Sequence, residues 1–144
     1  MQVYVPLIQK FAARLVLFHQ SVAQKLALNG TDVHSLRLLG DGSMSAGALS
    51  DEIGLTGAAV TALIDRLEKA GYAKRERGSD RRRITVHAVP EKLRELDALY
   101  AGQGVRMKKL LSKYSASEFK VIADFLEQTT VILTEEARKL KGNS

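Results

Sequence analysis

The sequence predicts a mainly α-helical fold with one small β-hairpin, and three observations support this prediction. Apolar residues recur at spacings of three and four near both ends of the 144-residue chain, which is the period of amphipathic helices. Two short helical segments joined by a glycine-containing turn lie between these stretches. A pair of short alternating segments follows, on either side of Gly78, Ser79 and Asp80, as expected for a hairpin.

The composition is that of an ordered globular chain, with 45% hydrophobic and 26% charged residues. The chain has no cysteine, which excludes disulfides, thiolate metal sites and thiol-based redox sensing. Charges interrupt every apolar stretch before the ~20 residues that a membrane helix needs, and the N-terminus lacks the pattern of a secretion signal. We therefore expect a single domain over residues 1–144, located in the cytoplasm and without a cofactor.

The first two helices are predicted at residues 3–28 and 31–39. An apolar stripe runs along the first helix, and Asn29 and Gly30 are predicted to end it. Thr31 is a suitable N-cap for the second helix, because its hydroxyl can accept a hydrogen bond from a free backbone N–H of the first turn.

Two short helices with a tight connection come next. Ser45 is predicted to cap a helix at residues 46–53, and Gly54 to provide the left-handed turn at its end. Thr56 is predicted to cap the following helix, which ends before Gly71. This arrangement is typical of a helix-turn-helix.

The hairpin is predicted from strands at residues 72–77 and 83–89. Pro90 begins the next helix, at a position where its missing N–H costs little. Ser115 is predicted to cap a last helix that extends to about residue 139. The helix-turn-helix followed by this hairpin predicts a winged helix-turn-helix region over residues 31–90.

Positive charge is concentrated in the hairpin. Residues 74–83 contain six basic residues and two acidic ones, a net +4 within a chain of net charge +6. A polyanion is the expected partner, because each cation that neutralises a phosphate releases a condensed counterion. The alternative is a basic hairpin that is only solvated and has no partner. For a charge run considered by itself, the two interpretations have about equal weight.

The second helix of a helix-turn-helix enters the major groove of DNA. Its predicted outer face is formed mostly of small residues, which allow a close approach to the bases. Thr61 can form a hydrogen bond or touch a thymine methyl group, and the free N–H groups near Thr56 can bind a phosphate. We expect few strong base contacts and a sizeable share of shape readout.

The hairpin tip is suited to the minor groove, where arginine side chains gain from an enhanced negative potential. Asp80 is predicted to pair with a neighbouring arginine and to fix its direction. The predicted DNA-contacting residues are Ser45, Thr56, Gly57, Ala58, Thr61, Ala62, Asp65, Arg66, Arg75, Arg77, Asp80, Arg81, Arg82 and Arg83.

The middle of the chain resembles a known family. Residues 44–56 read MSAGALSDEIGLT and residues 57–72 read GAAVTALIDRLEKAGY, which is similar to the winged-helix core of the MarR family. Asp80-Arg81-Arg82 fits the D-x-R signature of that family's wing, and Ile84-Thr85-Val86 fits the strand that follows it.

The resemblance implies a homodimer that binds a pseudo-palindromic promoter, usually as a repressor. It also implies release of the DNA when a small aromatic or phenolic effector enters a pocket between the dimer helices and the winged head. By the same resemblance Arg82 is the wing-tip arginine for the minor groove, Asp80 is its partner, and the helix after Thr56 reads the major groove.

Dimerisation is also a physical expectation from the sequence. Residues 1–30 and 110–144 are predicted to be dimerisation helices, with a connecting helix at 90–110. The terminal helices carry more apolar surface than a head of about sixty residues can cover, and a second copy would bury it. The alternative is that these helices pack on each other within a monomer.

Other kinds of site find little support in the sequence. His19, His34 and His87 lie on three different predicted elements, without further ligands at metal-binding spacing. No serine lies in a nucleophile elbow and no glycine loop has phosphate-binding spacing. We therefore predict that the protein is not an enzyme and holds no metal.

A ligand pocket is a further hypothesis. Aromatic walls with a nearby arginine would suit a small aromatic acid. The alternative reading of the same residues is core aromatics beside a surface arginine. The candidate pocket residues are Phe11, Arg14, Phe18, His34 and Arg37.

Two other functions are compatible with this fold. A winged-helix adaptor that binds proteins would have no need for three consecutive arginines at a hairpin tip. A non-specific architectural DNA-binding protein would have no need for a defined recognition helix beside the wing. Neither is excluded, and sequence-specific regulation of transcription is the leading prediction.

Overall fold

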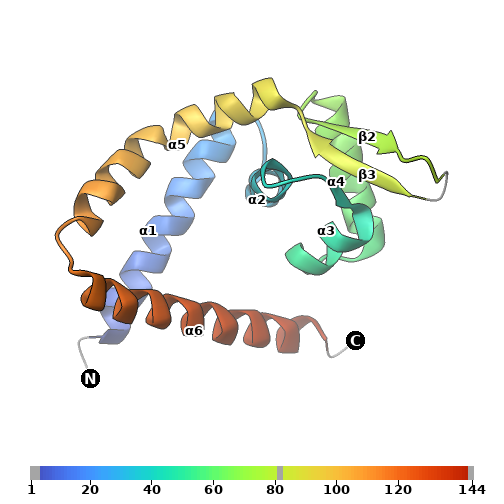
Figure 1. The fold of residues 1–144 in the computed structure, drawn as a ribbon. Helices are drawn as coiled ribbons and strands as arrows, with labels where there is room; N and C mark the ends of the chain where they lie inside the picture. The colour runs from blue at the N-terminus through green and yellow to red at the C-terminus, as the bar shows by residue number, and fades with distance from the viewer. Residues whose placement is uncertain (1–3, 81–82, 143–144) are drawn as a thin grey trace. The chain divides into compact units, whose positions relative to one another are not determined.

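The computed structural model describes residues 4–80 and 83–142 of the chain (Figure 1). The fold is mainly helical with a small antiparallel sheet, as predicted. It divides into two compact units, Met1–Tyr100 and Ala101–Ser144. The elements in chain order are α1 (Tyr4–Lys25), α2 (Gly30–Gly40), β1 (Met44–Ser45), α3 (Ala46–Ile53), α4 (Gly57–Lys69), β2 (Ala73–Arg77), β3 (Ile84–Ala88), α5 (Pro90–Leu111) and α6 (Ala116–Lys141).

The start of α2 differs from the prediction. Asn29, and not Thr31, is the N-cap: its side chain accepts a hydrogen bond from the backbone N–H of Asp32 at 2.8 Å. The carboxylate of Asp32 accepts in turn from the backbone N–H of Asn29 at 3.3 Å. Each side chain thus satisfies a free donor of the other residue. The N-cap therefore lies two residues before Thr31, and the helix begins at Gly30.

The caps of α3 and α4 are confirmed. The Ser45 hydroxyl accepts from the backbone N–H of Ala48 at 3.0 Å, and the Thr56 hydroxyl accepts from that of Ala59 at 3.3 Å. Gly54 has the left-handed conformation that was predicted, with a φ of 64°. These local bonds fix where the two helices of the helix-turn-helix begin and how they are connected.

The sheet has the strand order β1-β3-β2, with antiparallel pairs throughout. The hairpin strands β2 and β3 were predicted, and each is slightly shorter than expected. Strand β1, which pairs Met44 with Val86 and Ser45 with Thr85, was not predicted. Two residues are too short to show an alternating pattern, so only the distant partner strand identifies them.

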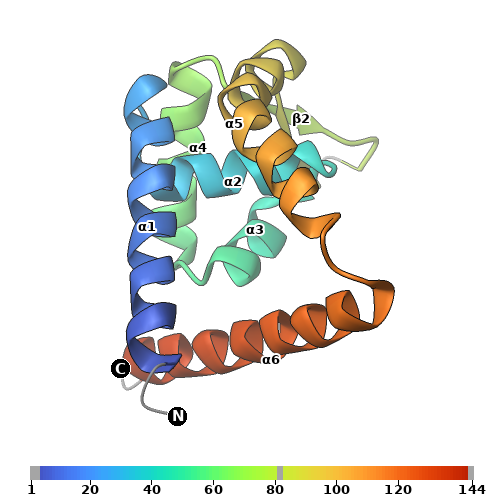
Figure 2. The ribbon, with the colours of Figure 1, turned by 90° about the vertical axis from the view of Figure 1, so that its left-hand side faces the viewer.

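The core of the first unit lies between the helices of the head and the inner face of the hairpin. Figure 2 shows α2 running from the side of α1 above α3, and α2 contacts both of these helices. The side chains at the centre of this core are fully buried, namely Leu36, Leu49, Val60, Leu63, Ile64, Leu67, Val86 and Leu96.

The apolar residues of α6 and of the first part of α1 remain exposed in the single chain. No described residue after Tyr100 is buried, although α6 has the regular apolar period of an amphipathic helix. Its N-terminus is well formed, because Ser115 and Glu118 make a second capping box. The exposed apolar residues include Leu7, Phe11 and Leu15 on α1 and Phe119, Phe125, Leu126, Ile132 and Leu133 on α6.

A helix must be both long and apolar to cross a membrane. Within residues 4–80 and 83–142, no helix meets both requirements.

Candidate nucleic-acid interface

The outer face of α4 is small and uncharged through its first two turns. Gly57, Ala58, Thr61 and Ala62 are all exposed there. The Thr61 hydroxyl donates a hydrogen bond to the carbonyl oxygen of Gly57 at 3.0 Å. This end of the helix carries only small side chains on its outer face, so it can approach a groove closely.

The next turn of α4 carries Arg66, which is paired within the protein. Its Nε and Nη2 atoms donate to the two carboxylate oxygens of Asp32, at 3.2 and 2.6 Å. The Asp32 side chain is buried, whereas about half of the Arg66 side chain is exposed. The hydrogen bond to Asp32 raises the pKa of Arg66, so the guanidinium keeps its charge.

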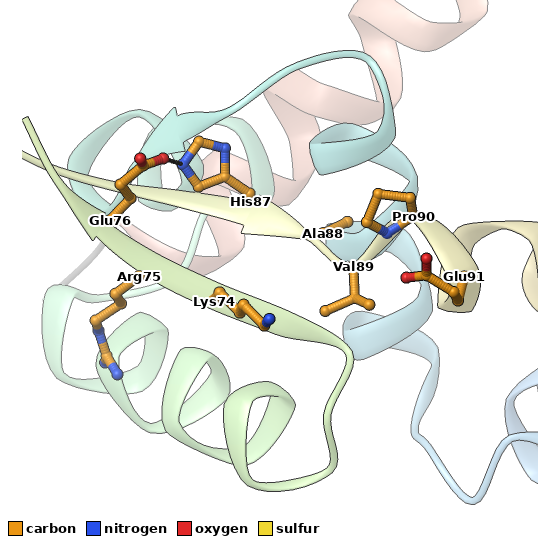
Figure 3. A pocket seen from close by; sticks show the side chains of 8 residues that line it. All are labelled: Lys74, Arg75, Glu76, His87, Ala88, Val89, Pro90 and Glu91. Carbon is orange, nitrogen blue, oxygen red and sulfur yellow. Dashed lines mark ion pairs between the residues drawn. The ribbon is translucent and has the colours of Figure 1, made fainter.

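Arg75, on β2, is also paired within the protein. Its Nη2 donates to Oδ1 of Asp65 at 2.6 Å, and its Nη1 is bonded to Oε2 of Glu68. The backbone N–H of Arg75 donates to the other oxygen of Glu68 at 2.8 Å. Figure 3 shows the Arg75 side chain extending from the hairpin toward α4. These bonds tie the wing to the recognition helix.

The far end of the hairpin carries exposed cations. Arg77 and Arg83 are exposed on β2 and just before β3. The turn is closed by the backbone, since Gly78 N–H donates to the carbonyl of Arg83 and Arg83 N–H donates to the carbonyl of Asp80, both at 3.0 Å. The predicted minor-groove residues Arg81 and Arg82 lie outside the described residues.

The remaining predicted DNA contacts lie at helix starts. The hydroxyls of Ser45 and Thr56 accept the capping hydrogen bonds of α3 and α4. Both residues are exposed, so each can still meet a phosphate together with the free N–H groups of its helix.

The opposite face of the hairpin carries a pair that sequence reasoning missed. His87 Nε2 lies 2.6 Å from Oε2 of Glu76, beside a hollow of about 540 Å³ where the hairpin meets the start of α5 (Figure 3). The register of β2 and β3 could have indicated this pair, because Glu76 lies opposite Thr85, two positions from His87. The contact joins the two hairpin strands.

The five candidate ligand residues are only partly brought together. Phe18 meets the ring of Tyr100 edge-on, with ring centroids 5.4 Å apart, and the Arg37 guanidinium lies 4.6 Å from the centroid of the same ring. Phe11, Arg14 and His34 are exposed on their helices.

Sequence reasoning did not find His19 and Tyr100, which complete this cluster. His19 Nδ1 lies 2.6 Å from the Tyr100 hydroxyl, and burial, followed by the nearby charge of Arg37, lowers the pKa of His19. Arg37 also borders a hollow of about 180 Å³ beside Leu93 and Asp97. That is smaller than most small-molecule sites, which span about 300–1,000 Å³.

The comparisons with known proteins agree with this geometry. A model of the MarR family matches residues 28–84, and the chain is 38% identical over 139 residues to the HTH-type transcriptional regulator YcgE of Bacillus subtilis. That alignment covers 95% of this chain and 90% of YcgE. The chain belongs to the MarR family. As a MarR-family protein it is a DNA-binding helix-turn-helix transcription regulator and not an enzyme.

Solved structures share the MarR-family fold with this chain. A MarR family protein from Bacillus stearothermophilus superposes with a TM-score of 0.68 at 22% identity, covering 90% of this chain and 91% of that one. A MepR variant from S. aureus bound to an oligodeoxyribonucleotide superposes with a TM-score of 0.63 at 17% identity, covering 90% and 97%.

Proposed function

We propose that this MarR-family protein represses transcription by binding a pseudo-palindromic promoter site as a homodimer, in the cytoplasm, and that a small aromatic or phenolic effector releases it. The observation that carries the DNA-binding part is the pairing of a small, uncharged helix face with an arginine-bearing hairpin on the same head. The first suits close approach to the major groove and the second suits the phosphates and the minor groove.

Two sets of bonds support a rigid reading head. Arg66 joins α4 to α2, and Arg75 joins α4 to β2. Because the recognition helix is attached on both sides, the helix and the wing would meet successive grooves as one body. The exposed Arg77 and Arg83 leave the wing basic after Arg75 is paired.

The homodimer is supported by the apolar residues that stay exposed in one chain. Leu7 and Phe11 on α1 are 62% and 56% exposed, and Leu126 and Leu133 on α6 are 50% and 64% exposed. Exposed apolar surface of this extent marks an interaction site. The simplest way to bury it is against the same helices of a second copy, related by a two-fold axis. A two-fold dimer would also match the symmetry of a pseudo-palindromic site.

The effector is supported by the cluster around Tyr100. Phe18 offers an aromatic edge there and Arg37 offers a cation for an acidic group. Thermal-shift measurements with small aromatic acids and phenols test this part, because a ligand that binds the folded protein raises its melting temperature. Stabilisation by an acid that also lowers DNA affinity is expected, and a screen in which no compound stabilises the protein counts against it.

DNA binding is tested by titrating the protein against duplex from its own upstream region and against arbitrary duplex, over a range of salt concentrations. Arg82→Ala is expected to weaken binding by about 1 to 3 kcal/mol and to flatten the salt dependence. Lys120→Ala, on the exposed surface of α6, removes the same charge and serves as the control.

Two binding results would contradict the DNA-binding part of the proposal, and one further measurement tests the dimer. Equal affinity for both duplexes would favour an architectural protein, and no binding to either would favour an adaptor. Sedimentation equilibrium of the purified protein tests the oligomeric state, and a monomer at micromolar concentration would exclude the proposed two-fold arrangement.

A further inference from the structure

The recognition helix lacks the side chains that usually read bases by hydrogen bonds. Guanine is read by arginine or lysine, adenine by asparagine or glutamine, and cytosine by a carboxylate. The first two turns of α4, with the sequence GAAVTALI, contain none of these residue types. Their outer face consists of Gly57, Ala58, Thr61 and Ala62.

The charged residues of the third turn are committed to the protein. Moving Arg66 to a base would leave Asp32, which is 1% exposed, without the donor of its 2.6 Å hydrogen bond. Asp32 would keep only the 3.3 Å hydrogen bond from the backbone N–H of Asn29, and a buried carboxylate that loses its charged partner is costly, so this guanidinium is a poor reader of guanine. Asp65 is likewise held by Arg75.

Thr61 has already used its donor. Its hydroxyl hydrogen bonds to the carbonyl oxygen of Gly57 in the preceding turn, so the oxygen is turned toward its own helix. The hydroxyl oxygen can then only accept hydrogen bonds, and the methyl group of Thr61 is the apolar group that is left to meet a base edge. Ala58 and Ala62, the neighbours on this face, add only further methyl groups.

We propose that α4 reads the 5-methyl groups of thymine, with Thr61 as the specificity-determining residue and Ala58 beside it. The 5-methyl group is the apolar feature that a base pair presents in the major groove, and only thymine carries it. Small residues on α4 allow the backbone to come close enough for methyl groups to touch. This inference rests on the proposed function, because it names the chemistry that the DNA-binding face recognises.

The test begins with a duplex selected from a randomised pool by the full-length protein. Each thymine of that duplex is then replaced by deoxyuridine, which removes the methyl group and leaves the base pair unchanged. At one or two positions in each half of the site, affinity is expected to fall about threefold to fivefold, as the loss of one buried methyl group implies. Thymines in the flanking sequence serve as controls and should be insensitive.

Two substitutions assign the effect to Thr61. Thr61→Ser keeps the hydroxyl and removes the methyl group from both copies of α4, one in each half of the site, so it should lose about ninefold to twenty-fivefold in affinity and no longer respond to deoxyuridine at those positions. Thr61→Val keeps a methyl group there and removes the hydroxyl, so it should keep the response. Circular dichroism of each variant checks that the helical content of the protein is unchanged.

The outcomes separate this inference from the proposed function. If the protein prefers its selected duplex and every deoxyuridine substitution is silent, methyl readout is wrong and specific DNA binding stands. Methyl readout is also wrong if the selected site has no thymine in the segment that α4 covers, or if Thr61→Ser keeps the deoxyuridine response. If selection returns no preferred duplex, the proposed function fails and the inference fails with it.

Discussion

Arg66 on the recognition helix donates two hydrogen bonds to the buried carboxylate of Asp32, at 2.6 and 3.2 Å. Asp32 is also the residue that completes the capping box of α2 with Asn29. One carboxylate therefore fixes the start of α2 and holds α4 beside it. The position of α4 is therefore held by this pair as well as by the apolar core beneath it.

The first prediction concerns the stability that this pair provides. Arg66→Ala should lower the free energy of unfolding by about 1 to 3 kcal/mol, because it leaves a buried carboxylate without its main donor. The lower part of this range is expected, since half of the Arg66 side chain is in water. Urea denaturation measures the change.

Lys69→Ala is the matched control for Arg66. Lys69 is exposed at the end of the same helix, and its loss should change stability by no more than about 0.5 kcal/mol. If Arg66 only positions α4, Arg66→Ala should weaken DNA binding by the same factor at every salt concentration. A reduced salt slope for Arg66→Ala would instead show that Arg66 contacts a phosphate.

The second prediction concerns Arg75 and the carboxylates that it neutralises. Arg75→Ala should weaken DNA binding, because Asp65 and Glu68 then face the phosphates without a compensating charge. The double variant Asp65→Ala, Arg75→Ala should recover part of the affinity, since it removes one of these negative charges. Titrations at low salt compare the three proteins. No recovery in the double variant would mean that Arg75 itself binds DNA.

The third prediction concerns pH. Burial, with the nearby charge of Arg37, lowers the pKa of His19 below its ordinary value of 6.5. The imidazole of His19 therefore binds a proton more readily in the unfolded chain than in the folded chain. The contribution of neutral His19 to the free energy of unfolding is complete above pH 6.5, and it is lost as the pH falls through the lower pKa of the folded protein. His19→Asn, which keeps a polar atom near Tyr100, should reduce this loss. Urea denaturation between neutral and mildly acidic pH measures it, and an equal pH dependence in both proteins would contradict it.

The fourth prediction concerns Gly102 and Gly104 in α5. A Cβ atom at either position would meet no atom within 4 Å, so steric fit does not require glycine there. Alanine at each position should raise stability by about 0.5 to 1 kcal/mol, because glycine inside a helix loses more backbone freedom on folding. Thermal unfolding measures the change.

Gly71→Ala makes the same chemical change with the opposite expected sign. Gly71 has a φ of 79°, where an L side chain is strained, so alanine there should destabilise the protein. If alanine at Gly102 or Gly104 is destabilising instead, that position is covered in the assembled protein.

Several elements were predictable from the sequence because their causes are local. Ser45, Thr56 and Ser115 were predicted as caps, and each bonds a backbone N–H three residues later. The apolar period located the long helices, and the glycine turn located the helix-turn-helix. The cap of α2 was predicted wrongly at Thr31, because Asn29 was assigned to the end of the first helix and the reciprocal bonds of Asn29 and Asp32 are seen only in the structure.

The assignment of the charged residues could not be made in this way. Arg66 and Arg75 were predicted to contact DNA because they are basic and lie beside the reading helix. Arg66 bonds a carboxylate 34 positions away in the sequence, and strand β1 pairs with residues about 40 positions later. Patterns within a few residues of the sequence cannot identify partners that are so distant along the chain.

The sequence alone determines the helices, their caps, the basic hairpin and the membership of a regulator family, because hydrophobic period, capping and motif act over a few residues. The tertiary structure decides which cations are paired and which stay exposed. Whether an arginine is paired depends on which carboxylates lie beside it in the folded chain. A buried carboxylate needs a charged partner, whereas an exposed one is solvated by water.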